Sequence, residues 1–137
     1  KSTIFEKYVW GSNMAIADNG NILLLSDKFC GTNYKEYAKA QVDYLLGNNG
    51  NGYCFLTGFG TLSPISTHHR PSQSIKSTMK GMLVGGPNME LNDPYAQNVL
   101  AGKAPALCYC DNEQSYSCNE ITIYWNSPLV NLMAQLK

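Results

Sequence analysis

The sequence carries little charge and no excess of either sign. Its 137 residues contain ten Lys or Arg and ten Asp or Glu, so the formal net charge is zero and charged residues make up only 15%. Nucleic acid binding depends on clustered Lys and Arg, so this composition argues against a polyanion-binding protein. Disorder requires few apolar residues and high charge, whereas 44% of this chain is hydrophobic. We therefore expect one folded domain.

Long apolar runs, a leader sequence and abundant cysteine are also missing. The longest clean apolar run, residues 22–25, is far shorter than the roughly 18 residues of a membrane-spanning helix. The N-terminus has no basic segment followed by an apolar segment and a cleavage site, so it shows no signal peptide. Five cysteines are too few for a disulfide scaffold of this length, and an odd number cannot all pair internally.

Apolar residues at helical spacing predict two helices in the first third of the chain. A broad apolar face over residues 12–29 predicts the first helix, with Gly31 as its C-terminal stop. Asn33 followed by Glu36 has the spacing of a capping box and predicts the start of a second helix, which Gly47 closes. The two together predict a helical hairpin.

The remainder of the chain is predicted as a long loop and two further helices. Residues 48–92 are rich in glycine, lack sustained periodicity and carry both histidines, so we expect a functional loop. Asp93, followed by a proline, predicts the N-cap of a short helix that ends near residue 102. The last helix is expected over about 117–136, kinked or divided at Pro128. The predicted class is all-α with long loops.

Within the loop, His68, His69 and Arg70 form a cluster of hydrogen-bond donors and acceptors. Such side chains can simply be solvated on a surface loop. Alternatively, neutral imidazoles and the rigid guanidinium can hold hydroxyl groups or a carboxylate in a fixed geometry. A metal-binding module built from these histidines and the cysteines at 108, 110 and 118 is a weaker alternative, because Cys-x-Cys is not the usual zinc spacing.

Two acidic residues near the C-terminus also have local structural interpretations. Ser117 and Glu120 match a capping box, so Glu120 can be a helix cap, or it can be a general acid at the mouth of a cleft. Asp111 opens a stretch of turn-forming residues, which favours a local turn. Trp10 and Tyr116, taken singly, are more often core residues than sugar-stacking platforms.

Two long motifs occur in order along the chain. They are Thr57-Gly58-Phe59-Gly60-Thr61 with His68-His69-Arg70, then Tyr109-x-Asp111, Tyr116, Glu120, Thr122 and Asn126-Ser127, together with Tyr44-Leu45-Leu46-Gly47 and Gly81-Met82-Leu83-Val84-Gly85-Gly86-Pro87-Asn88. With these motifs the sequence resembles the C-terminal part of glycoside hydrolase family 9 catalytic domains, the inverting cellulases. The resemblance covers essentially the whole chain, from residues 8–13 to 126–129.

This resemblance implies an (α/α)6 barrel whose loops line a cleft for β-1,4-glucans. By matched position, Glu120 would be the general acid and Asp111 an active-site support. His68 would act with Arg70 on the sugar nearest the cut. Tyr116 would stack on a neighbouring sugar, and Trp10 is a weaker candidate for the same role. A helix N-terminus at Glu120 would favour the ionised carboxylate, whereas a general acid must hold its proton.

The catalytic base of an inverting enzyme is missing from the chain. Family members carry it in an Asp-Ala-Gly-Asp-type motif in the N-terminal half, and no such motif occurs here. Residues 1–137 therefore resemble a C-terminal fragment of one catalytic domain, which we expect to be inactive alone and to need the N-terminal part of the barrel as its partner. The alternative is a carbohydrate-binding fragment without turnover.

The resemblance also sets expectations about cofactors, partners and location. It implies a β-glucan substrate, no nucleic acid or membrane partner and no cofactor for catalysis. It allows a structural calcium in the complete domain, and it implies a secreted enzyme.

Overall fold

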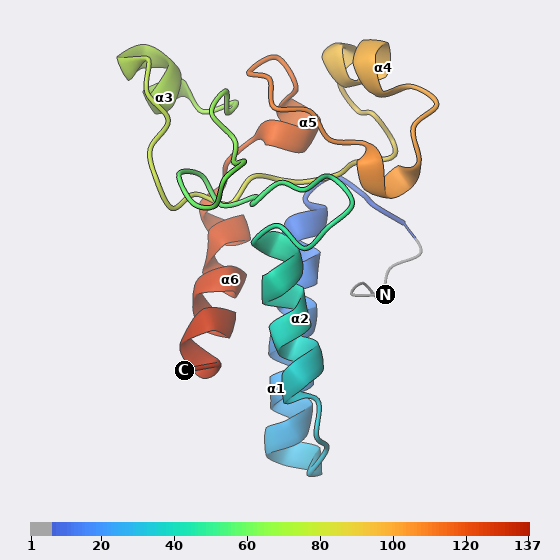
Figure 1. The fold of residues 1–137 in the computed structure, drawn as a ribbon, viewed down its shortest axis with the longest axis vertical. Helices are drawn as coiled ribbons and strands as arrows, with labels where there is room; N and C mark the ends of the chain where they lie inside the picture. Colours follow the sequence, from blue (N-terminus) through green and yellow to red (C-terminus); the bar gives the residue numbers. More distant parts are fainter. Residues whose placement is uncertain (1–6) are drawn as a thin grey trace.

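A computed structural model describes residues 7–137, which form three long helices beneath a layer of loops and short helices (Figure 1). The long helices are α1 (Ser12–Cys30), α2 (Lys35–Leu45) and α6 (Ile123–Gln135). The short ones are α3 (Arg70–Ile75), α4 (Pro94–Leu100), the 3-10 helix η1 (Pro105–Leu107) and α5 (Tyr116–Asn119). No β-strand longer than an isolated bridge occurs in this part of the chain, so the predicted all-α class is confirmed. No helix among these residues is long and apolar enough to cross a membrane.

The predicted hairpin of the first two helices is confirmed, but the predicted N-cap of the second helix was wrong. Helix α1 ends at Gly31, which adopts the left-handed conformation with φ 66°. Asn33 does not cap α2, which has Tyr34 at its N-cap without a side-chain hydrogen bond there. Instead, Asp27 at the end of α1 accepts hydrogen bonds from Tyr34 N (2.7 Å) and from Thr32 Oγ1 (2.8 Å). A residue of the preceding helix thus fixes the connection.

Helix α1 packs closely against α6 because it carries a glycine at the contact. Gly20 is buried, and a Cβ atom built there would lie 2.4 Å from Leu132 Cδ2. Next to it, Asn21 donates to the backbone oxygen of Pro128 at 2.9 Å and accepts from Asn131 at 2.8 Å. The glycine that weakens the helix pattern in the sequence therefore has a packing role.

The last helix begins later than predicted, since the chain is extended between α5 and α6. Glu120 has φ −71° and ψ 155°, and Thr122 is the N-cap of α6, with its hydroxyl accepting from Trp125 N at 3.2 Å. The predicted capping box of Ser117 and Glu120 is therefore wrong. Pro128 lies inside α6 and does not divide it.

Residues 48–92 are mostly irregular, as predicted, but they contain α3, which was not predicted, and they pack on the helices. Gly86, with φ 90°, allows its backbone to pass Asn13, because a Cβ there would lie 2.3 Å from the Asn13 side chain. Asn13 donates from Nδ2 to the backbone oxygen of Val84 at 2.9 Å, and Ser12 donates to that of Pro87 at 2.7 Å. This glycine-rich run anchors the start of α1.

A single main core joins the helices to the loop layer. Phe55, Leu83 and Val84 of the loop layer are fully buried together with Ile16 of α1 and Leu45 of α2. Burial of side chains of this size contributes roughly 1.5–3 kcal/mol each. The loops are thus fixed to the helices by apolar packing and can hold side chains in defined positions.

Candidate active site

His68 and Glu120, 52 positions apart in the sequence, lie side by side at the junction of the loops and α5. The two residues form an isolated parallel bridge, in which the backbone N–H of His68 donates to the oxygen of Asn119 at 2.9 Å. On its other side, the oxygen of Glu120 accepts from Gly85 N at 3.1 Å. The backbone pairing fixes the histidine loop against the segment that carries the predicted general acid.

The imidazole of His68 is oriented by a backbone carbonyl. Its Nδ1 lies 2.6 Å from the oxygen of Glu113. A carbonyl oxygen only accepts hydrogen bonds, so Nδ1 carries the proton and, in the neutral ring, Nε2 has a lone pair. Nε2 can therefore accept a hydrogen bond from a hydroxyl group of a bound molecule.

Three rings follow one another beside this histidine. The ring centroids of His68 and Tyr116 are 5.9 Å apart, and those of Tyr116 and Trp10 are 5.6 Å apart. Trp10 is 41% exposed and Tyr116 is half-buried. The structure thus brings Trp10 and Tyr116 together at the predicted site, and neither ring is enclosed in the core.

Asp111 fixes the loop that leads to His68. Its two carboxylate oxygens accept from the backbone N–H groups of Ile65 (2.8 Å) and Ser66 (3.0 Å), and one of them also accepts from Asn119 Nδ2 at 3.0 Å. Hydrogen bonds to a charged group contribute more than neutral ones. With three donors on its carboxylate, Asp111 holds residues 65–66 in place and is suited to support rather than to proton transfer.

Asn119 is a central residue of the site that the sequence analysis missed. It is fully buried, and its Nδ2 donates to Ser66 O at 2.7 Å as well as to Asp111, while its Oδ1 accepts from Tyr109 OH at 2.7 Å. Its position directly before Glu120 in the matched motif was the available signal. The side-chain partners are separated by up to 53 positions in sequence, so spacing alone did not reveal them.

Asp93 also has a second role beyond the predicted N-cap. One carboxylate oxygen caps α4 through Ala96 N at 2.6 Å, which confirms the cap. The other accepts from Ser115 Oγ at 2.9 Å and from Ser117 through both N (3.0 Å) and Oγ (2.5 Å). Burial alone would raise the pKa of Asp93, but the hydrogen bonds from Ala96, Ser117 and Ser115 outweigh it and hold the pKa below its usual value.

The charged groups of Arg70 and Glu120 have no protein partner within residues 7–137. Arg70 is the first residue of α3 and is exposed, whereas Glu120 is half-buried. Glu120 precedes the N-cap of α6 by two residues, and it follows the last residue of α5. It is therefore not inside a helix N-terminus, contrary to the position that the predicted capping box gave it.

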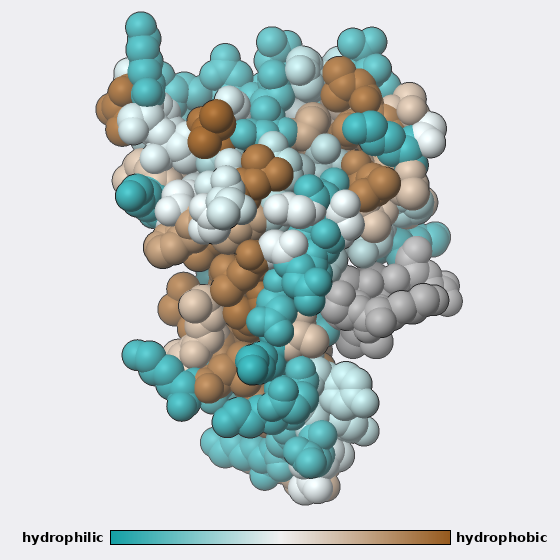
Figure 2. Space-filling view, in the orientation of Figure 1, coloured by the Kyte–Doolittle hydropathy of each residue, from teal (hydrophilic) through white to brown (hydrophobic). Residues whose placement is uncertain are grey.

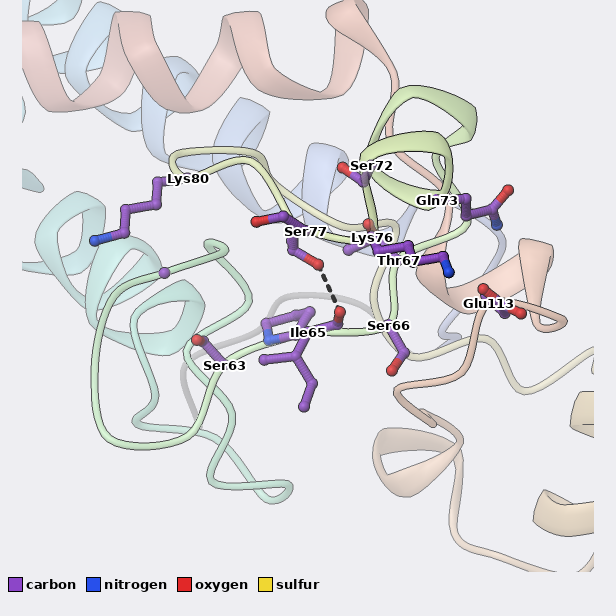
Figure 3. Close-up of a pocket in the computed structure, with 13 residues that line it drawn as sticks. Ser63, Ile65, Ser66, Thr67, Ser72, Gln73, Lys76, Ser77, Lys80 and Glu113 are labelled. Atoms are coloured by element: carbon purple, nitrogen blue, oxygen red, sulfur yellow. Dashed lines mark hydrogen bonds between the residues drawn. The ribbon is translucent and has the colours of Figure 1, made fainter.

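A pocket lined mainly by polar residues includes Ile65, Ser66 and Thr67, which precede His68 in the chain (Figure 3). It has a volume of about 520 Å³ and is lined by Ser63, Ile65, Ser66, Thr67, Lys76, Thr78 and neighbouring residues. Thr78 Oγ1 donates to Ile65 O across it at 2.5 Å, the dashed line in Figure 3. None of the predicted site residues lines this pocket, although Asp111 binds the backbone of two residues that do.

The described residues offer no metal site. In residues 7–137, no group of three or more His, Cys, Asp or Glu side chains is placed to hold a metal ion. The histidines at 68 and 69 contact a backbone oxygen and a serine hydroxyl instead. The structural calcium that the resemblance allows stays a prediction for the complete domain.

Curated proteins with similar sequences are glucan-degrading enzymes. The chain is 40% identical over 129 residues to a cellodextrinase of Butyrivibrio fibrisolvens, a match covering 90% of this chain and 23% of that protein. It is 42% identical over 105 residues to a xyloglucan-specific endo-beta-1,4-glucanase of Bacteroides ovatus, covering 75% of this chain and 17% of that protein. The chain thus spans less than a quarter of the length of these two relatives.

Solved structures and a family model agree with these relatives. AaCel9A in complex with cellobiose-like isofagomine matches with a TM-score of 0.89 and 39% identity, over 94% of this chain and 25% of that one. The family 9 endoglucanase J30 matches with a TM-score of 0.90 and 34% identity, over the same shares. The predicted portion of an (α/α)6 barrel is therefore confirmed. Because the model of glycosyl hydrolase family 9 also matches residues 1–133, this chain belongs to glycosyl hydrolase family 9.

Proposed function

We propose that the complete protein hydrolyses β-1,4-glucosidic bonds of cellulose or related β-glucans with inversion, and that this chain supplies the general acid and part of the sugar-binding surface. Glu120 would protonate the leaving oxygen. His68 and Arg70 would bind the sugar beside the cut, and Tyr116 and Trp10 would stack on neighbouring sugars. The observation that carries the proposal is the backbone pairing of His68 with Glu120, which brings both family motifs to one place.

The chemistry of the rings and donors supports a carbohydrate ligand. The rings of Trp10, Tyr116 and His68 follow one another in space, with centroid separations of 5.6 Å and 5.9 Å. Partly exposed aromatic rings of this kind present apolar faces that can cover the C–H face of a sugar. His68 Nε2 can accept from one hydroxyl, and the unpaired guanidinium of Arg70 can donate to two oxygens at once.

The chain supplies one of the two carboxyl groups that inversion needs. In an inverting enzyme the acid and the base are about 6.5–9.5 Å apart, with water between them. Asp111 is the other acidic residue of the matched motif, but its oxygens already accept from three donors. The base is therefore expected outside this chain, and turnover is expected only in the complete domain.

Exposed apolar side chains on the helices support a partner surface for the rest of the barrel. Figure 2 shows apolar side chains gathered along α6 and beside α2. Those of α6 include Ile123, Tyr124, Val130 and Met133, and those of α1 include Ile22, Leu25 and Phe29. Patches beyond a few hundred Å² on a soluble domain usually mark an interface. The proposed occupant is the N-terminal part of the same barrel.

Replacement of Glu120 by glutamine in the complete protein tests the assignment. General acid catalysis contributes typically 10²–10⁴-fold, so kcat on soluble cellulose should fall by about that factor while KM changes little. Glu90→Gln, at an exposed position, should leave kcat unchanged. A folded Glu120→Gln protein with near-normal kcat would show that Glu120 is not the acid. Inversion is checked separately by NMR of the first product anomer formed.

A carbohydrate-binding role without turnover is the second candidate, and the occupied carboxylate of Asp111 favours it for this chain alone. The two functions differ in one measurement. The complete protein either releases reducing ends from soluble cellulose or only shows retarded migration in gels that contain it.

Secretion is likewise a proposal, tested by finding the activity in the culture medium of the source organism.

A further inference from the structure

Two cysteines beside the proposed active site form a contacting thiol pair. The thiol of Cys110 hydrogen-bonds to the sulfur of Cys118, and the backbone N–H of Cys110 points to the same sulfur. Ser115 Oγ lies 3.1 Å from Cys118 Sγ. Cys118 is fully buried, whereas Cys110 is half-buried. The pair therefore has one member within reach of solvent and one enclosed.

The pair differs from the third cysteine of this region in its surroundings. Hydrogen bonds from Cys110 and Ser115 lower the pKa of Cys118 to about 7 despite its burial, and the hydrogen bond between the two thiols raises the pKa of Cys110. Cys108 instead lies 3.5 Å from Ala104 O and 3.7 Å from Lys103 O, and burial raises its pKa. A carbonyl oxygen only accepts, so the Cys108 thiol donates to the backbone and not to the pair.

We propose that Cys110 and Cys118 form a disulfide when the protein meets a low-molecular-weight disulfide. Once the pair has lost one proton to water, the remaining proton is shared between the two sulfurs, and when it lies on Cys118 the Cys110 thiolate attacks the small disulfide. A mixed disulfide forms and one small thiolate leaves. Cys118 then loses its proton to water and attacks the Cys110 sulfur, releasing the second small thiol. Two protein thiols are oxidised, and one small disulfide is reduced to two thiols.

The crosslink would close the segment that builds the site. Residues 111–117 lie between the two cysteines, and they include Asp111, the His68 acceptor Glu113, and Tyr116. A disulfide here would restrict this segment in the partly unfolded protein and would hold it near the structure described. The inference concerns covalent chemistry of the pair and does not depend on glucan hydrolysis.

Peptide mapping of the complete protein tests the proposal. The purified, reduced protein is incubated with oxidised glutathione, alkylated with N-ethylmaleimide and digested without reductant by a glutamate-specific protease. Cleavage after Glu90, Glu113 and Glu120 places Cys110 in peptide 91–113 and Cys118 in peptide 114–120. We expect most of the protein to give these two peptides joined, in a species that disappears on reduction.

Variants decide which cysteines are joined. Cys108→Ser should keep the crosslink, because peptide 91–113 still contains Cys110, whereas Cys110→Ser should abolish it. Cys110 is half-buried, so this second variant is expected to fold even where Cys118→Ser does not. The proposal is overturned if both cysteines are recovered alkylated or glutathionylated, or if the crosslink persists in Cys110→Ser and vanishes in Cys108→Ser.

Discussion

Asp93 links the helix α4 to the start of α5, so replacing it by asparagine should weaken both connections at once. The carboxylate is 1% exposed and accepts four hydrogen bonds, one on the first oxygen and three on the second. Two of the donors are the backbone N–H groups of Ala96 and Ser117, on opposite oxygens. Asparagine has one oxygen, so in either orientation its NH2 group faces a backbone N–H.

The size of the effect follows from these contacts. A buried donor left unsatisfied costs about 1–3 kcal/mol, and hydrogen bonds to a charged group contribute about 1.5–3 kcal/mol against about 1 for neutral ones. The two serine hydroxyls can rotate and accept from the NH2 group, which keeps part of the interaction. We therefore expect Asp93→Asn to lower the free energy of unfolding by about 3–4 kcal/mol.

Urea unfolding of the complete protein, followed by circular dichroism, measures this loss as a lower midpoint with an unchanged m value. Asp43→Asn serves as the control, since Asp43 is exposed on α2 and such changes usually lie within about 0.5 kcal/mol. A loss below about 1 kcal/mol for Asp93→Asn would show that the four contacts do not carry the stability assigned to them.

The same carboxylate predicts a pH dependence with a definite sign. The folded-state pKa of Asp93 is lowered, so its stabilisation is present above the unfolded value of about 3.9 and is lost as the pH falls through the folded value. The difference between wild type and Asp93→Asn should therefore be constant near neutral pH and shrink below about pH 4. A difference that grows on acidification would contradict the lowered pKa.

Three further predictions concern the site, the packing and the isolated chain. Arg70→Lys should reduce kcat/KM of the complete protein far more than Lys76→Arg in the adjacent segment, because an ammonium cannot hold two oxygens as a planar guanidinium does; equal small losses would mean a solvated loop. Gly20→Ala places a Cβ 2.4 Å from Leu132, and overpacking should lower the free energy of unfolding by about 1–3 kcal/mol, partly offset by a gain of up to about 1 kcal/mol in helix propensity. Urea titrations measure this loss, and adding Leu132→Ala to Gly20→Ala should relieve part of the overpacking. Residues 1–137 alone should be inactive on cellulose and should bind a hydrophobic dye, and an active, cooperatively unfolding monomer would contradict this.

Some parts of the fold could be predicted from the sequence because the interactions that cause them are local. The helix at 12–30 ends at Gly31, and Asp93 caps α4, because a left-handed glycine and an N-cap carboxylate act within a few residues of themselves. The two errors in capping have a common origin. Asn33 and Ser117 match capping patterns, but carboxylates on other elements bind at these places instead: Asp27 accepts from Tyr34 N, and Asp93 accepts from both N and Oγ of Ser117.

The sequence by itself determined the all-α class and the family, because motif identity and spacing are properties of the chain. It also indicated His68, Arg70, Asp111, Tyr116 and Glu120 as candidate site residues. The tertiary structure decided how they meet. Only folding pairs His68 with Glu120, aligns Trp10 with Tyr116, and makes Asn119 join Tyr109, Ser66 and Asp111. These contacts join residues 8 to 106 positions apart. A hydrogen bond or ring contact across that separation depends on the packing of α1, α6 and the loops, which local patterns do not encode.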